Sequence, residues 1–119
     1  MQTVTALREA CQKLPGSAET FPFGLETLVL KVGGKLYALI GLKDDPLTLS
    51  LKCDPVRAEA LRRAHVQIVP GYHLSKKHWN TLTLDGALPG ALVAELLAHS
   101  YDLVLGSLTR AQRAEVNGG

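Results

Sequence analysis

The chain has 119 residues, the length of a single domain, and 46% of them are hydrophobic, which excludes a disordered chain. The net charge of +2 implies no strong attraction to a polyanion, yet residues 52–78 hold six basic and two acidic side chains, a local net charge of +4. The chain starts without a signal-peptide pattern, and no apolar run approaches the roughly 20 residues that cross a bilayer. We therefore expect a cytoplasmic protein with no membrane partner.

The chain begins with a predicted helix over residues 3–14, whose apolar side chains recur at helical spacing. Pro15-Gly16 ends this helix. Residues 17–24 form a turn-rich connection, and we expect the rings of Phe21 and Phe23 to pin it to the core.

Three strands follow this connection. Residues 25–32 and 35–42 are rich in Val, Ile and Leu, and Gly33-Gly34 between them predicts a tight hairpin because both positions can adopt positive φ. In residues 47–52, Leu alternates with Thr, Ser and Lys. This alternation predicts one buried face and one face that meets solvent or a partner.

The second half predicts a helix, two strands and a long helix. Asp54-Pro55 is a typical helix start, and the predicted buried stripe of that helix is Val56, Ala60, Leu61 and Ala64. The remaining elements are strands at 66–69 and 80–85, an amphipathic helix at 89–108, and a short tail with a capping box from Thr109 to Gln112, frayed over 113–119. The sequence thus predicts one α+β domain, residues 1–119, of order α-β-β-β-α-β-β-α, with a mainly antiparallel sheet packed by helices.

Residues 70–80 combine aromatic, cationic and turn-forming side chains more densely than any other stretch. Lys76 and Lys77 suit phosphate groups, Trp79 can stack on bases, and Asn80, next to His78 and Trp79, can bond a base edge. The alternative is a hairpin whose tryptophan packs on the sheet while the lysines stay in solvent.

Two further basic pairs complete the candidate nucleic-acid surface. Lys31 and Lys35 flank the Gly33-Gly34 turn, and Arg62 and Arg63 are predicted on the open side of the second helix. The full candidate set is Lys76, Lys77, His78, Trp79, Asn80, Lys31, Lys35, Arg62 and Arg63. This hypothesis requires the six lysines and arginines to share one face of the fold.

Metal and catalytic alternatives find little support in the sequence. Cys11 and Cys53 are far apart and fit reduced, buried thiols, and Cys53 with His73 and His78 lacks paired zinc-ligand spacing. Glu95, His99 and Asp102 share a helix face without a nearby nucleophile, and no P-loop pattern is present. We expect no metal, no cofactor and no enzymatic activity.

Motifs along residues 10–110 resemble one known family. They are Cys11, Leu14-Pro15-Gly16, Phe21-Pro22-Phe23-Gly24, Lys31-Val32-Gly33-Gly34-Lys35, Leu51-Lys52-Cys53-Asp54-Pro55, Leu61-Arg62, Pro70-Gly71-Tyr72-His73, Lys76-Lys77-His78-Trp79-Asn80-Thr81 and Ser100-Tyr101-Asp102-Leu103-Val104. In these motifs the chain resembles the MmcQ/YjbR family. The resemblance implies a small α+β domain and a DNA-binding label that stems from a double-wing arrangement, two hairpins flanking a helix.

Two functions follow as hypotheses. The first is a small binding domain that holds double-stranded DNA weakly and mostly through phosphates. The second is a protein-interaction or chaperone-like domain that meets a partner or a second copy through an exposed strand face or the long terminal helix, without nucleic acid.

Overall fold

The computed structural model describes residues 3–71 and 74–118, and it confirms the α+β class. The elements are α1 (Val4–Gln12), β1 (Ser17–Thr20), β2 (Thr27–Val32), β3 (Lys35–Gly41), β4 (Leu47–Lys52), α2 (Pro55–Ala64), β5 (Ile68–Pro70), β6 (Trp79–Leu84), α3 (Gly90–Gly106) and α4 (Arg110–Gly118). The strands form a sheet of order β1-β2-β3-β4-β6-β5, and each adjacent pair is antiparallel.

Local sequence signals fix several element ends. Gly33 and Gly34 both adopt positive φ, +58° and +80°, so the predicted β2–β3 hairpin is confirmed. The side chain of Asp54 accepts a hydrogen bond from the backbone N–H of Arg57 at 3.2 Å, and Pro55 opens α2. The capping box of α4 is also confirmed, because Thr109 and Gln112 exchange hydrogen bonds of 2.9 and 3.1 Å.

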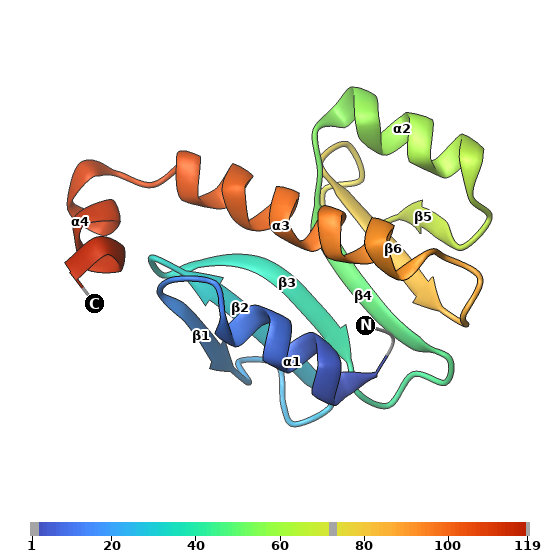
Figure 1. Ribbon diagram of the computed structural model, residues 1–119, viewed down its shortest axis with the longest axis horizontal. Coiled ribbons are helices and arrows are strands. Elements are labelled where there is room, and N and C mark those ends of the chain that lie inside the picture. The colour runs from blue at the N-terminus through green and yellow to red at the C-terminus, as the bar shows by residue number, and fades with distance from the viewer. Residues whose placement is uncertain (1–2, 72–73, 119) are drawn as a thin grey trace.

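The helices lie on one face of the sheet, with α3 running across its middle (Figure 1). That covered face contains the core: α1 contributes Leu7 and Cys11, and the strands contribute alternating residues such as Leu49 and Leu51. α2 sits over β5 and β6. On the opposite face of the sheet, which carries Thr48 and the other side chains of its parity, no helix of the described residues lies; we call it the open face.

One buried hydroxyl joins α3 to an irregularity of β3. The pairing of β2 with β3 shifts register at Leu30/Lys31, so Tyr37 has no partner residue in β2. Ser100 Oγ donates to the Tyr37 carbonyl at 2.6 Å and accepts from the Lys52 backbone N–H at 2.9 Å. Ser100 thus provides hydrogen-bond partners for two backbone groups, the Tyr37 carbonyl and the Lys52 N–H, and it fixes α3 against the sheet.

The segment after α1 differs from its prediction. Residues 17–20 form the edge strand β1 and pair with β2, where the sequence suggested only a turn-rich connection. The two phenylalanines do not pin it to the core, since the exposed fractions of Phe21 and Phe23 are 45% and 69%. Polar Ser17 and Glu19 hid the strand, because an edge strand needs little apolar character.

The predicted buried stripe of α2 is wrong. Val56 is 77% exposed, Ala60 and Ala64 are exposed, and Leu61 is half-buried, while the fully buried residue is Ala58. Alanines populate several faces of this helix, so their spacing does not mark the core. The face is set by the contacts of Ala58 and the Arg62 side chain with β6.

The C-terminal tail is more ordered than the sequence suggested. α4 continues to Gly118, and Val116 is buried in the core cluster, where its side chain lies so close to Gly16 that a Cβ there would come within 2.9 Å. Among the described residues, no helix has the length and apolarity needed to cross a membrane.

Candidate functional site

The stretch 70–80 is tied to α2 by a hydrogen-bond network. Asn80 is 2% exposed; its Nδ2 donates to the Ala58 carbonyl at 3.3 Å, and its Oδ1 accepts from Arg62 Nε at 2.7 Å. The Arg62 guanidinium also donates to the carbonyls of Lys76 and Trp79. Neither Asn80 nor Arg62 presents its polar atoms as a free recognition group; both hold α2 against β6 and the preceding loop.

The aromatic and imidazole groups of the same stretch are also packed. Trp79 is buried, and Gly71 faces it so closely that a Cβ on Gly71 would lie 2.7 Å from the Trp79 Cβ. His78 is half-buried, and its carbonyl accepts from the Cys53 backbone N–H at 2.8 Å. Tyr72 and His73 lie outside the described residues; among the described residues of this segment, Lys76 and Lys77 are the exposed basic side chains.

The six lysines and arginines of the candidate surface lie in different environments. Lys31 projects from the open face of β2, whereas Lys35 reaches the helix side, where Nζ is 3.4 Å from the Ser107 carbonyl. Their hairpin lies across β4 from the α2 region, which carries Arg62 and exposed Arg63 (Figure 1). The structure does not gather these residues into one continuous basic face.

Two of the acidic and imidazole groups of α3, Glu95 and His99, contact the start of α2. Arg57 and Glu95 form an ion pair at 2.5 Å, and His99 Nε2 accepts from the Asp54 backbone N–H at 3.3 Å. Asp102 stays exposed one turn further along the helix. Within residues 3–71 and 74–118, no three His, Cys, Asp or Glu side chains gather in a way that could hold a metal ion.

The buried thiols and the buried phenol lack the environment of reactive groups. Burial raises the pKa of the Cys11 and Cys53 thiols, which disfavours the nucleophilic thiolate. Burial also raises the pKa of Tyr37, whose hydroxyl lies 2.5 Å from Ser17 Oγ and whose ring meets Tyr101 edge to face. These residues are core structure.

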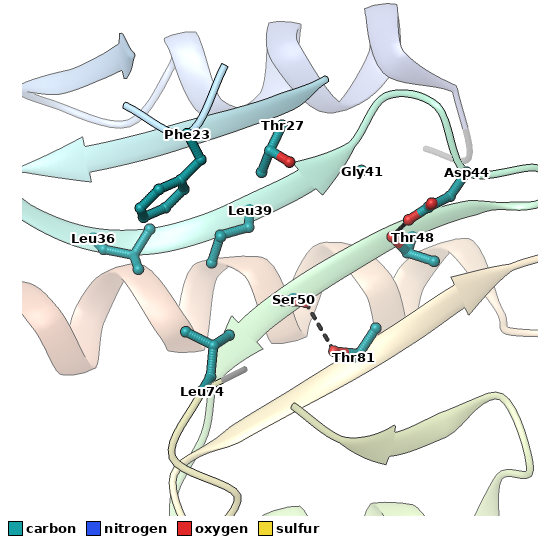
Figure 2. A pocket seen from close by; sticks show the side chains of 10 residues that line it. All are labelled: Phe23, Thr27, Leu36, Leu39, Gly41, Asp44, Thr48, Ser50, Leu74 and Thr81. Atoms are coloured by element: carbon teal, nitrogen blue, oxygen red, sulfur yellow. Dashed lines mark hydrogen bonds between the residues drawn. The ribbon is translucent and has the colours of Figure 1, made fainter. Parts of the chain in front are cut away.

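The open face contains a groove of about 580 Å³ (Figure 2). The residues that line this open-face groove are Phe23, Thr27, Leu36, Leu39, Gly41, Asp44, Thr48, Ser50, Leu74 and Thr81. Its floor comes from β3, β4 and β6, while Phe23 and Leu74 come from the loops before β2 and before β6. The volume is in the range of typical ligand sites, which are apolar clefts with a few placed polar groups.

The groove has an apolar and a polar end. Phe23, Leu36 and Leu74 lie toward one end, and Asp44 lies at the other (Figure 2). Across the floor, the hydroxyls of Ser50 and Thr81 are 2.8 Å apart. The arrangement suits a ligand with an apolar body and one polar extremity.

The carboxylate of Asp44 is held above Gly41. Thr48 Oγ1 donates to Asp44 Oδ2 at 2.5 Å, and the Asp44 backbone N–H donates to the Gly41 carbonyl at 3.1 Å. A Cβ on Gly41 would come within 2.1 Å of Asp44 Oδ2 and 2.5 Å of Thr48 Oγ1. The missing side chain of Gly41 therefore leaves the space that the carboxylate occupies.

Only a general indication of this site is visible in the sequence. The alternation of Leu49 and Leu51 with Thr48 and Ser50 predicted a face meeting solvent or a partner, and that face is now the groove floor. Phe23 and Leu74 come from loops, whose position over a sheet no periodicity encodes.

The chain is thus a small α+β domain with an antiparallel sheet that is covered by helices on one face only. A family model described as YjbR matches residues 12–103, and the chain belongs to this family. The predicted resemblance is confirmed.

Relatives of known sequence or structure agree with this assignment. The chain is 32% identical to "Uncharacterized protein YjbR" of Escherichia coli K12 over 111 residues, 93% of this chain and 94% of that protein. It is 34% identical to "Uncharacterized protein YbdF" of Escherichia coli O157:H7 over 116 residues, 97% and 93% of the two chains.

A solved Deinococcus radiodurans structure, protein DR2400, shares 56% identity with a TM-score of 0.92, covering 98% of this chain and 89% of that one. A Pseudomonas syringae structure shares 25% identity with a TM-score of 0.74, covering 86% and 98%. The fold is common to these proteins.

Proposed function

We propose that this chain is a protein-interaction domain and not an enzyme, and that it binds apolar side chains of a partner protein in the open-face groove. The observation that carries the proposal is the groove itself, hollowed in the sheet face that no helix covers. Phe23 of the groove is exposed, and so are Phe21 and Leu25 in the same loop. Large exposed apolar side chains grouped beside a cleft are typical of interaction sites.

The test is selection of displayed peptides on the intact protein, with a blocked groove as the comparison. Ser50 lies on the groove floor, so Ser50→Trp fills the groove without touching the covered face. Val66→Trp is the control, since Val66 is 88% exposed in the turn between α2 and β5. We expect selected peptides to lose at least tenfold in affinity for Ser50→Trp, which is about 1.4 kcal/mol of binding free energy. The same peptides should bind Val66→Trp as they bind the wild type.

Equal binding to both variants contradicts the proposal, and so does a selection that yields no groove-dependent peptide. Leu39→Glu provides a second block by charge if Ser50→Trp alters the circular dichroism spectrum or the melting temperature. Sedimentation of the free protein tests the second copy as occupant; a dimer broken by Ser50→Trp would show that the groove is filled by self-association.

Weak DNA binding through Lys76 and Lys77 alone, without the continuous basic face that the wider hypothesis required, is a second candidate because both lysines are exposed in a loop whose Lys76 carbonyl accepts a hydrogen bond from Arg62. Such binding would be dominated by phosphate contacts and would weaken steeply with salt. Fluorescence anisotropy with a random-sequence duplex should then show a loss for the charge reversal Lys76→Glu/Lys77→Glu. The pair Lys31→Glu/Lys35→Glu is the matched charge control, and no binding at low salt rules this candidate out.

A further inference from the structure

We infer that the occupant of the open-face groove is an amphipathic helix of a partner protein, and that a lysine or arginine at its edge meets the carboxylate of Asp44. This inference rests on the proposed function and gives it a chemical class of ligand. It follows from the hydrogen bonding of the floor, the polarity of the groove and the position of one carboxylate.

The floor of the groove offers side chains and no free strand edge. β3 lies between β2 and β4, β4 lies between β3 and β6, and β6 lies between β4 and β5. A peptide cannot add a strand there, so recognition must come from side chains. An occupant on this surface is favoured if it satisfies its own backbone hydrogen bonds, and a helix does so.

The length of the groove fits a short helix. The floor follows β3 from Leu36 to Gly41, a span of about 16.5 Å at roughly 3.3 Å per residue. A helix of this length has about eleven residues, or three turns, at 1.5 Å per residue. Apolar side chains at i, i+3 or i+4 and i+7 would meet Leu36, Leu39 and the flanking Phe23 and Leu74.

Asp44 supplies the charge complementarity. Among the described residues that line the groove, Asp44 is the only charged one. Its neighbour Lys43 is already paired with Glu26 at 2.6 Å, and among the ion pairs of the described residues none includes Asp44. The Thr48 hydroxyl and the space above Gly41 hold the carboxylate over the face. A cationic side chain at the edge of the apolar stripe of a bound helix would pair with the Asp44 carboxylate.

The test is a library of helical peptides displayed on phage and selected on the intact protein. We expect the selected sequences to share apolar residues at helical spacing and a lysine or arginine at one end of the stripe. Proline placed in the middle of a selected peptide should abolish binding, because it breaks the helix.

A double-mutant cycle isolates the interaction between the Asp44 carboxylate and the cationic residue of the peptide. Asp44→Asn keeps the shape and the acceptor for Thr48, and Asp102→Asn is the control because Asp102 is exposed on α3, away from the groove. We expect Asp44→Asn to weaken the cationic peptide about three- to fivefold at low salt, in the range of exposed ion pairs, and Asp102→Asn to leave it unchanged. A peptide with glutamine in place of its lysine should bind wild type and Asp44→Asn equally.

The outcomes separate this inference from the proposed function. If binding is lost in Ser50→Trp but requires neither a helical peptide nor a cationic residue, the groove is still the binding site and the inference of a helical, cationic occupant is wrong. Binding that tolerates Ser50→Trp overturns both. Equal weakening by Asp44→Asn and Asp102→Asn also contradicts the pairing with Asp44, because it would reflect net charge alone.

Discussion

Residues 70–80 and the open-face groove differ in how strongly the sequence and the structure suggest a function for them. Residues 70–80 hold the tryptophan, a lysine pair and an amide, and they drew the functional hypothesis, yet Trp79, Asn80 and their partner Arg62 are packed and hydrogen-bonded within the fold. The open-face groove is lined mainly by Leu, Thr and Ser, residues without distinctive chemistry. Dense polar chemistry can thus be architecture, whereas ordinary side chains can line a groove on an exposed face.

The largest expected effect comes from breaking the architecture of the first region. Arg62→Ala removes the donor to Asn80 and to two backbone carbonyls and leaves a buried amide oxygen without that bond. We expect a loss of about 2–3 kcal/mol in the free energy of unfolding, measured by urea denaturation. The matched control is the exposed neighbour Arg63→Ala, which should stay within about 0.5 kcal/mol. Similar losses for both variants would show that Arg62 contributes no more to stability than an exposed arginine.

The free energy of unfolding should fall at alkaline pH because of a buried phenol on the covered face. Because burial raises the pKa of Tyr37, the native state keeps a proton that the unfolded chain releases above about pH 10. Stability contributed by this group is therefore complete below that pH and falls as pH rises, by up to about 1.4 kcal/mol per pH unit. Denaturation at a series of pH values should show this slope, and Tyr37→Phe should reduce it. An unchanged slope in Tyr37→Phe would assign it to other groups, such as the buried Cys11 thiol.

The polar end of the groove can be disturbed with one methyl group. Gly41→Ala would push against Asp44 and Thr48, whose polar atoms stand within 2.1 and 2.5 Å of the added Cβ. We expect a cost of about 1 kcal/mol in the free energy of unfolding and a weaker grip on cationic peptides. Gly106→Ala is the control, since a Cβ there meets nothing within 4 Å. If the two variants behave alike, Asp44 moves freely and is not held over the face.

The aromatic wall of the groove should matter for binding and hardly for folding. Phe23 is largely exposed, so Phe23→Ala should change the free energy of unfolding by no more than about 0.5 kcal/mol while weakening groove-selected peptides. Val56→Ala removes an equally exposed apolar side chain on α2. Isothermal titration of both variants gives the comparison; a peptide that binds both like wild type would exclude the loop from the site.

Much of the fold was predictable because its signals are local. The Gly33-Gly34 turn, the cap at Asp54 and the box from Thr109 to Gln112 each depend on residues a few positions apart. The edge strand β1 was missed because an edge strand needs little apolar patterning, and the buried side of α2 was misassigned because alanine marks no face.

The candidate site was less predictable, since it depends on distant segments. The role of Asn80 requires knowing that Arg62 reaches it across 18 positions, and the groove requires Phe23 and Leu74 from two loops, one before β2 and one before β6. The alternation in β4 identified the open face without showing its shape. Tertiary geometry, and not residue type, distinguishes the groove from the rest of the surface.

Binding of apolar groups in the open-face groove can be tested directly by nuclear magnetic resonance. Millimolar indole, a small aromatic probe, is titrated into the isotope-labelled protein while backbone amide shifts are followed. We predict saturable shifts concentrated at groove residues such as Leu36, Leu39 and Leu74, and their loss in Ser50→Trp. Shifts of equal size around exposed Val56 and Val66, or shifts that persist in Ser50→Trp, would show that the groove is not the binding site.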